Sequence, residues 1–173
     1  MVYDFRTHGI SQELTLHATH AYIWSLTLDL AKSLCWELSS ERGLDELLVW
    51  IDSLDPDQHL DAFRACLLVF SVTDGWVVPR QFQLEAGLAT YRGKNTIINA
   101  GTGSGKTLSM VIPLLMNLEA IAIIISPLKR LQTTQARELE RFLIKPLAIN
   151  QDVELSLAEI KVPRIEFHLC RLA

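Results

Sequence analysis

Residues 100–107 of this chain read Ala100-Gly101-Thr102-Gly103-Ser104-Gly105-Lys106-Thr107. The glycines allow consecutive backbone N–H groups to curl around a phosphate with no side chain in the way. A helix that begins near Lys106 directs the positive end of its dipole at that anion. We expect Lys106 to reach the β- and γ-phosphates of a nucleoside triphosphate, and Thr107 to offer its hydroxyl to Mg²⁺. The stretch therefore predicts a phosphate-binding loop, with ATP as the expected ligand.

The segments on either side of this loop alternate between strand and helix patterns. Asn95–Asn99 is a short apolar run that predicts a strand before the loop, and a helix is expected over residues 106–118 after it. Ile121–Ile125 is rich in β-branched residues and predicts a strand buried on both faces. A charged helix is expected over residues 133–142, and Leu147–Ile149 is a candidate third strand. This alternation predicts an α/β fold, a three-layer αβα sheet domain that is incomplete on its C-terminal side.

The first 76 residues carry helical patterns. Apolar residues recur there at steps of three and four, first as Ile23, Leu26, Leu30, Leu34 and Leu38, and then as Leu44, Leu47, Leu48, Ile51 and Leu54. Asp55-Pro56 predicts a helix start, with Asp55 as the cap and Pro56 in the first helical position. We therefore divide the chain into an all-helical N-terminal region (1–76), a nucleotide-binding domain (77–150) and an unassigned tail (151–173).

Composition and charge narrow the class of protein. The chain has 173 residues, about one domain by length, and its net charge of −4 is unlike that of a strongly basic nucleic-acid-binding protein. A local basic patch can still bind nucleic acid. The three cysteines are scattered, which is typical of reduced thiols inside the cell. The sequence shows neither a secretory signal nor a membrane-spanning run, so we expect an intracellular protein that does not use a membrane.

Two further blocks flank the loop. Pro79-Arg80-Gln81-Phe82-Gln83 precedes it, and Ser126-Pro127-Leu128-Lys129-Arg130-Leu131 follows it. In this order and spacing, the three blocks resemble the first part of superfamily 2 helicases, and most closely RecQ-like ATP-dependent DNA helicases. The resemblance covers about residues 78–142 and implies part of a RecA-like P-loop NTPase domain. It implies ATP and DNA binding within a 3'-5' helicase, with single-stranded DNA or a duplex junction as the partner and the nucleus as the location.

The resemblance also implies roles for individual residues. In the family, the position of Gln83 hydrogen-bonds adenine and that of Arg80 lies against the base. An amide offers a donor beside an acceptor, and a guanidinium plane stacks on a π-face. The ATP phosphates are held by Ala100, Gly101, Thr102, Gly103, Ser104, Gly105, Lys106 and Thr107, and Lys106 is the expected catalytic residue. The nucleic-acid backbone is touched at Ser126, Pro127 and Leu128, within a stretch made basic by Lys129, Arg130, Arg137, Arg141 and Lys145.

The sequence departs from this family in a part that hydrolysis needs. An apolar strand ending in Asp-Glu holds Mg²⁺ and positions the attacking water, and this chain has no such motif. Ile165-Glu166-Phe167-His168 echoes it without the Asp, and the preceding Lys161–Arg164 suits a buried strand poorly because it contains proline and charges. No second RecA-like domain is recognisable. We expect a truncated helicase part that binds ATP with little or no hydrolysis, and that is poorly soluble alone because its sheet edge is unpaired.

Two other functions are compatible with the same residues. The chain can be a non-catalytic interaction protein that keeps a helicase-like fold, which the absent acidic motif favours. It can also be a P-loop kinase or NTPase of another class, against which the Arg80/Gln83 block and the Ser126–Leu128 block argue.

Aromatic and histidine residues outside the motifs have ordinary interpretations. The four tryptophans are expected to pack in the core or between helices: Trp24, Trp36, Trp50 and Trp76. His17 and His20 would share a helix face but have no partner at metal-ligand spacing, so we expect them at the surface.

Overall fold

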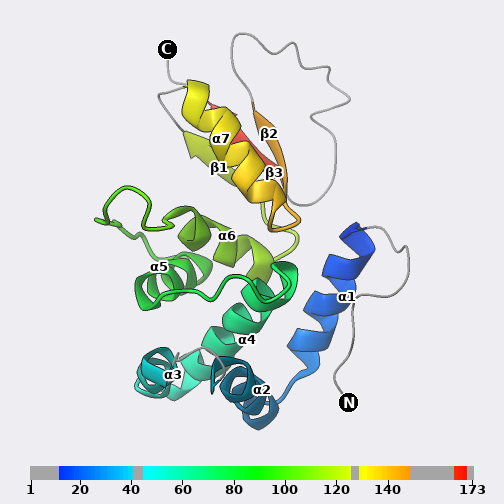
Figure 1. The fold of residues 1–173 in the computed structure, drawn as a ribbon, viewed down its shortest axis with the longest axis vertical. Coiled ribbons are helices and arrows are strands. Elements are labelled where there is room, and N and C mark those ends of the chain that lie inside the picture. The colour runs from blue at the N-terminus through cyan, green and yellow to red at the C-terminus, as the bar shows by residue number, and fades with distance from the viewer. Residues whose placement is uncertain (1–11, 41–44, 126–128, 149–165, 171–173) are drawn as a thin grey trace.

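The computed structural model describes residues 12–40, 45–125, 129–148 and 166–170 of the chain. Figure 1 shows the elements that these residues form. In chain order they are α1 (Gln12–Ser25), α2 (Leu28–Ser40), α3 (Asp45–Asp52), α4 (Pro56–Val72), α5 (Gln81–Tyr91), α6 (Thr107–Met116), β1 (Ala122–Ile125), α7 (Lys129–Glu140), β2 (Lys145–Ala148) and β3 (Glu166–Cys170). No helix within the described ranges is long and apolar enough to cross a bilayer.

The helical character predicted for the N-terminal region is confirmed where the structure describes it. Helix α4 begins at the predicted position, with an extended Asp55 (φ −62°, ψ 142°) and Pro56 in the first turn, although the Asp55 side chain makes no capping hydrogen bond. It ends in a turn where Asp74 (φ 48°) and Gly75 (φ 77°) adopt left-handed backbone angles. The apolar stripe predicted from Ile23 to Leu38 is divided between α1 and α2, and Leu30 within it is exposed.

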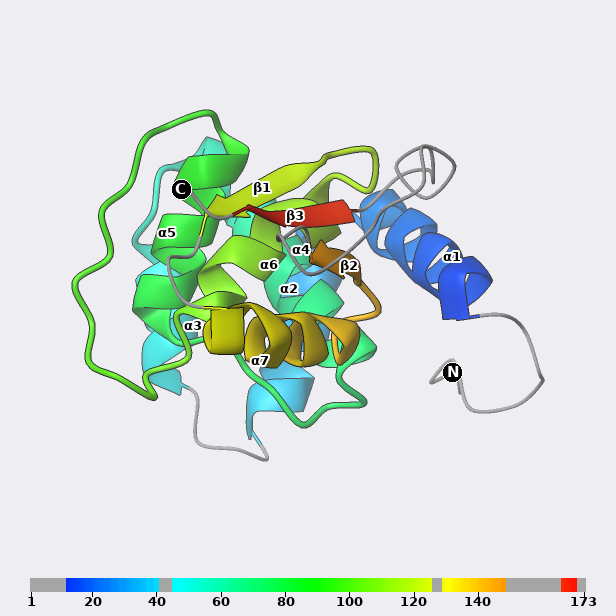
Figure 2. The same ribbon diagram turned by 90° about the horizontal axis from the view of Figure 1, so that it is seen from above.

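Among the described residues, the sheet consists of three parallel strands in the order β1-β3-β2. Figure 2 shows β3 between its two neighbours. The register pairs His168 with Ile123 on one side and with Leu147 on the other. The candidate strand at Leu147 is thus confirmed as β2, although Ile149 lies outside the described residues. The central strand β3 was not predicted, because its residues show no strong periodicity and follow a proline-containing run.

Two predictions about the sheet are wrong. Asn95–Asn99 forms no strand, and Ile97 within it is fully exposed. β1 is buried on one face only: Ala122 and Ile124 pack against the core, whereas Ile123 is 67% exposed and Ile125 is 57% exposed. A short apolar run becomes a buried strand only when neighbours pair its backbone and cover both its faces. In the described residues Asn95–Asn99 has no strand partner, and β1 is paired by β3 but is not covered on the face of Ile123 and Ile125. The predicted three-layer αβα arrangement is therefore not confirmed there.

One hydrophobic core joins the N-terminal helices to the helix that follows the phosphate loop. Leu68 and Val69 of α4 belong to the same buried cluster as Val111 and Ile112 of α6. Helices α5 and α6 approach each other at Gly87, where an added Cβ would lie 2.7 Å from the Cβ of Ile112. The position of α6 therefore depends on helices that lie far from it in the sequence.

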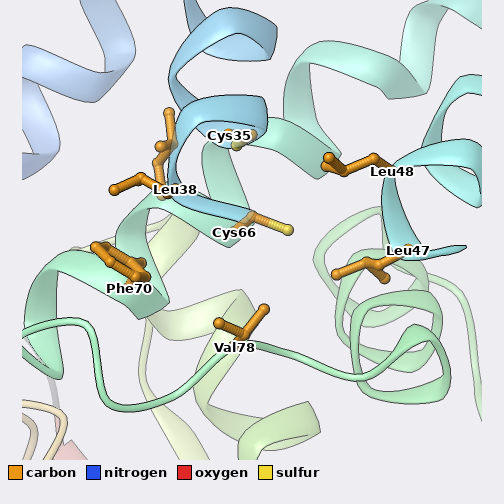
Figure 3. Close-up of a pocket in the computed structure, with 8 residues that line it drawn as sticks. Cys35, Leu38, Leu47, Leu48, Cys66, Phe70 and Val78 are labelled. Atoms are coloured by element: carbon orange, nitrogen blue, oxygen red, sulfur yellow. The ribbon is translucent and has the colours of Figure 1, made fainter. Parts of the chain in front are cut away.

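A small apolar cavity lies among α2, α3 and α4 (Figure 3). Its volume is about 30 Å³, and its lining consists of Cys35, Leu38, Leu47, Leu48, Cys66, Leu67, Phe70 and Val78. The volume would hold one water, but a site without polar partners stays dry. Both cysteines are buried in this lining, and neither forms a disulfide. The cavity is part of the core and is separate from the phosphate loop.

Candidate nucleotide-binding site

The phosphate loop connects α5 to α6 and takes its shape from its glycines. Gly103 (φ 79°) and Gly105 (φ 81°) adopt left-handed backbone angles that other residues rarely reach. Helix α6 begins at Thr107, directly after Lys106, as the sequence predicts. In both overall views the chain between α5 and α6 swings away from the helices (Figures 1 and 2). The loop is thus an open backbone curve that ends on a helix N-terminus.

Lys106 folds back over this curve. Its ammonium donates hydrogen bonds to the main-chain oxygens of Ala100 and Gly101, each over 2.8 Å. These bonds hold the positive charge against the backbone at the start of the loop. Both acceptors are neutral carbonyl oxygens, so the charged oxygens of a phosphate can take their place as hydrogen-bond acceptors for Lys106.

Gln83 braces the loop from α5. Its side chain is only 4% exposed. The amide nitrogen donates to the main-chain oxygens of Ser104 (3.2 Å) and Gly105 (2.8 Å), and the amide oxygen accepts from the backbone N–H of Arg80 (2.7 Å). Both amide hydrogens are engaged within the protein, so an adenine contact through them requires one of these bonds to open. The predicted contact of Gln83 with the base remains a prediction.

Arg80 lies at the N-terminal end of α5, in the extended residue that precedes Gln81. Its side chain is exposed. Pro79 before it is buried and fixes the direction of the chain at this point. Arg80 is therefore accessible to a ligand, as its predicted stacking role requires, and that role also remains a prediction.

Thr107 is the first residue of α6 and meets a residue that the sequence did not suggest. Its hydroxyl donates to Oε2 of Glu138 in α7 over 3.1 Å. The two residues are 31 positions apart, and no spacing rule predicts the contact. The structure thus places a carboxylate beside the hydroxyl that is expected to face Mg²⁺.

A cavity of about 580 Å³ opens beside these groups. The linker between α4 and α5, the phosphate loop and α7 all contribute to its lining, which consists of Thr73, Trp76, Val77, Gln83, Gly105, Thr107, Leu108, Glu138, Arg141 and Phe142. Its volume is in the range of sites for small molecules and cofactors. Two of the predicted loop residues, Gly105 and Thr107, therefore lie at the wall of a space large enough for a nucleotide.

Trp76 is the clearest difference from the sequence prediction at this site. It was expected to pack in the core, but its side chain is 85% exposed. The turn at Asp74 and Gly75, both with positive φ, reverses the chain after α4 and leaves Trp76 at the cavity. The other three tryptophans are partly buried against the core, as predicted: Trp24, Trp36 and Trp50.

The predicted nucleic-acid and acidic sites receive less support from the described residues. Ser126, Pro127 and Leu128 lie outside them, between the end of β1 and the start of α7. Glu166, the echo of the acidic motif, stands at the first position of β3, whereas the motif would end a strand. In parallel sheets ligands bind at the carboxyl ends of the strands. Glu166 therefore lies at the amino end of β3, whereas the missing acidic pair would lie at the carboxyl end of a strand.

Within the described part of the chain, no three His, Cys, Asp or Glu side chains are grouped so that they could hold a metal ion. The donors at the phosphate loop are the Thr107 hydroxyl and the Glu138 carboxylate. Both are hard oxygen donors of the kind that Mg²⁺ prefers, and Mg²⁺ usually takes only one or two protein ligands and completes its shell with phosphates and water. The residues present fit Mg²⁺ bound together with a nucleotide.

Comparison with known proteins is consistent with this geometry. Residues 80–165 match the family described as DEAD/DEAH box helicase, a range that extends further towards the C-terminus than the resemblance over residues 78–142. Two similar proteins are named "Probable ATP-dependent RNA helicase DDX52", one from Mus musculus and one from Rattus norvegicus, and each is 38% identical over 71 residues. Each match covers 38% of this chain and 12% of the relative, so the chain spans a small part of these relatives. The match of residues 80–165 to DEAD/DEAH box helicases supports a superfamily 2 helicase domain, which suggests ATP and nucleic-acid binding.

Proposed function

We propose that this chain is the ATP-binding part of a superfamily 2 helicase that acts on RNA. The position of Lys106 and Thr107 carries the proposal: both lie at the N-terminus of α6, on a glycine loop that borders the cavity. Phosphates would replace the two carbonyl oxygens that now accept from Lys106, because a charge-assisted hydrogen bond is stronger than a neutral one. The loop N–H groups and the helix dipole would add to this attraction.

The cavity beside the loop supports binding of the base as well as the phosphates. Trp76 offers an exposed aromatic face at its wall, and Arg141 lines the same space. Aromatic stacking favours any base, so selection of adenine would depend on polar groups. We propose that Gln83 supplies them by exchanging one of its bonds to the loop for a bond to adenine, while Arg80 lies against the base.

We favour RNA over DNA as the nucleic-acid partner because both named relatives are RNA helicases. The RecQ-like resemblance had suggested DNA. Contact with the sugar-phosphate backbone is proposed at Ser126, Pro127 and Leu128, which begin a stretch of the sequence that also contains the exposed Arg137 and Arg141. Such contacts bind phosphate without reading sequence.

Calorimetry of ATP with Mg²⁺ on the full chain tests the nucleotide proposal. The wild-type chain should bind, and Lys106→Ala should lose binding because the phosphates lose their cation. Lys94→Ala is the matched control, since Lys94 is exposed in the same connection between α5 and α6. If the folded wild-type chain binds no ATP, the phosphate-binding proposal fails and a non-catalytic interaction protein becomes the better interpretation. ATP turnover should remain low in every variant, because no apolar run ending in Asp-Glu follows the phosphate loop to position the attacking water.

Fluorescence anisotropy with labelled oligo(U) and oligo(dT) tests the choice of nucleic acid. In the presence of a non-hydrolysable ATP analogue, the chain should bind oligo(U) more tightly than oligo(dT). Binding should weaken as the salt concentration rises. Stronger binding to oligo(dT) would instead favour the DNA helicases that the flanking blocks resemble.

A further inference from the structure

Glu138 faces the nucleotide site from an element that has no assigned role there. Its Oε2 accepts the hydrogen bond from Thr107 Oγ1 at 3.1 Å, and both residues line the cavity of about 580 Å³ beside the phosphate loop. Arg141 lines the same cavity one helical turn further along the chain. The contact places the negative charge of Glu138 beside the first turn of α6, where the phosphates of a nucleotide would bind.

This charge has opposite effects on free and metal-bound nucleotide. A carboxylate repels the triphosphate alone, because like charges lie close together in a partly buried site. With a divalent cation between them, the same carboxylate attracts the complex. Thr107 provides a neutral oxygen and the phosphates provide charged ones, so one further carboxylate completes the kind of donor set that Mg²⁺ takes with nucleotides. The sequence offers no Asp-Glu motif to supply it.

We propose that Glu138 binds, directly or through one water, the Mg²⁺ ion that accompanies the nucleotide at Thr107. The proposal rests on the proposed function, because it requires a nucleotide at this loop. It assigns to α7 a positioning role: Glu138 would exchange its bond from the Thr107 hydroxyl for the cation, and the hydroxyl would turn its oxygen to the same ion. Nucleotide binding at this loop then depends on Mg²⁺ through a residue that lies outside the recognised motifs.

A purely structural role for Glu138 makes different predictions. If the bond only ties α6 to α7, its loss should lower the melting temperature and weaken nucleotide binding equally with and without Mg²⁺. If Glu138 binds the cation, its loss should weaken binding only when Mg²⁺ is present. Removal of the carboxylate should leave binding in EDTA unchanged or stronger, because a repulsive charge is gone.

The test uses the full chain and the variants Glu138→Gln and Glu140→Gln. Both variants remove one negative charge from α7, but Glu140 is exposed and does not line the cavity. Binding of a fluorescent ADP analogue is titrated with Mg²⁺ and repeated in EDTA. The half-saturating Mg²⁺ concentration should rise about tenfold or more in Glu138→Gln, as for loss of other metal-supporting residues, and should stay unchanged in Glu140→Gln. Electron paramagnetic resonance with Mn²⁺ should show less nucleotide-dependent bound ion in Glu138→Gln only.

The possible outcomes separate this inference from the proposed function. If the wild-type chain binds nucleotide and both variants respond to Mg²⁺ as it does, the role of Glu138 is overturned and the proposed function stands. If the folded wild-type chain binds no nucleotide, both fail. If Glu138→Gln does not fold, Glu138→Ala also removes the carboxylate, and a Mg²⁺ dependence equal to that of the wild type in this variant would overturn the proposal.

Discussion

The side-chain nitrogen of Gln83 lies 2.8 Å from the main-chain oxygen of Gly105, so helix α5 directly supports the phosphate loop. The same closeness leaves no room for a side chain at Gly105, where an added Cβ would lie 2.6 Å from that nitrogen. The loop shape is therefore fixed by two independent features, the left-handed backbone of Gly105 and the buried amide beside it.

Gly105→Ala should destabilise the chain and abolish ATP binding. A non-glycine residue at a φ of +81° costs about 1–3 kcal/mol, and the collision with Gln83 adds to this cost. Urea unfolding followed by circular dichroism gives the stability, and calorimetry gives the affinity. Gly101→Ala is the control for stability, because Gly101 has no positive φ and nothing lies within 4 Å of an added Cβ. Equal stability of the two variants would contradict the constraint at Gly105.

Gly87→Ala should lower stability, although alanine normally stabilises a helix over glycine by about 1 kcal/mol. The new Cβ would lie 2.7 Å from the Cβ of Ile112 and force α5 and α6 apart. Overpacking of this kind costs about 1–3 kcal/mol. The sign of the change in the free energy of unfolding is the readout, and an increase would show that the two helices are less closely packed than described.

Acid should loosen α1 through His20. Burial lowers the pKa of His20 below its usual 6.5, and repulsion from His17 and Arg64 lowers it further, while the hydrogen bond to the Met116 oxygen acts in the opposite direction. Because the folded-state pKa is depressed, the stabilisation from neutral His20 is present above pH 6.5 and is lost as the pH falls below it.

His20→Phe provides the comparison, since it keeps an aromatic ring against Trp24, on which His20 stacks at 4.1 Å. Unfolding curves at pH 7.5 and pH 5.5 should show a smaller loss of stability on acidification for the variant than for the wild type. The same acid sensitivity in both chains would exclude His20 as the cause.

The sequence predicted those parts of the fold that depend on local signals. Helix α4 begins at the predicted Asp55-Pro56, and α6 begins directly after the phosphate loop, which follows from its own residue order. Local signals do not determine strand pairing, so β3 was missed, and Asn95–Asn99 was wrongly assigned as a strand. A pentapeptide with two isoleucines between polar residues is compatible with a strand or with an exposed connection, and only its neighbours decide between them.

In the candidate site, too, the residues with local sequence signals were predicted and those placed by tertiary contacts were missed. Lys106 and Thr107 were placed correctly at the start of α6 because their roles depend on adjacent residues. Glu138 and Trp76 were missed because each reaches the cavity through tertiary structure. For Trp76 a signal was present, since Asp74-Gly75 predicts a turn after which a large side chain can be left at the surface. For Glu138 no sequence signal exists.

The thiols of Cys35 and Cys66 should be unreactive in the folded chain. Burial raises the pKa of Cys66 to about 12 and raises that of Cys35 further, with the neighbouring Cys66 as a second cause. A colour assay with Ellman's reagent on the Cys170→Ser variant should therefore show almost no reaction until urea is added. Rapid reaction of either thiol under native conditions would contradict the buried cavity of Figure 3.

The same two thiols predict a loss of stability in alkali. Their folded-state pKa values lie above the usual 9.0, so their contribution is fully present below pH 9 and is lost as the pH rises from there. The double variant Cys35→Ala/Cys66→Ala should be less stable at pH 7, because it enlarges the cavity, but it should lose less stability between pH 8 and pH 10.5. A parallel decline in both proteins would assign the alkaline effect to other groups.

Trp76→Ala should weaken ATP binding without changing stability. The side chain is 85% exposed, so its removal costs little packing, while stacking of a base on an aromatic ring contributes about 1–3 kcal/mol, or about 5- to 150-fold in affinity. Calorimetry with ATP measures the affinity, and thermal unfolding checks that the fold is intact. Trp76→Phe is the matched control, because it keeps an aromatic face at the cavity and should retain most of the affinity. If Trp76→Ala binds ATP as tightly as the wild type, the base does not lie against Trp76, and the cavity beside the loop accommodates only the phosphates and their cation.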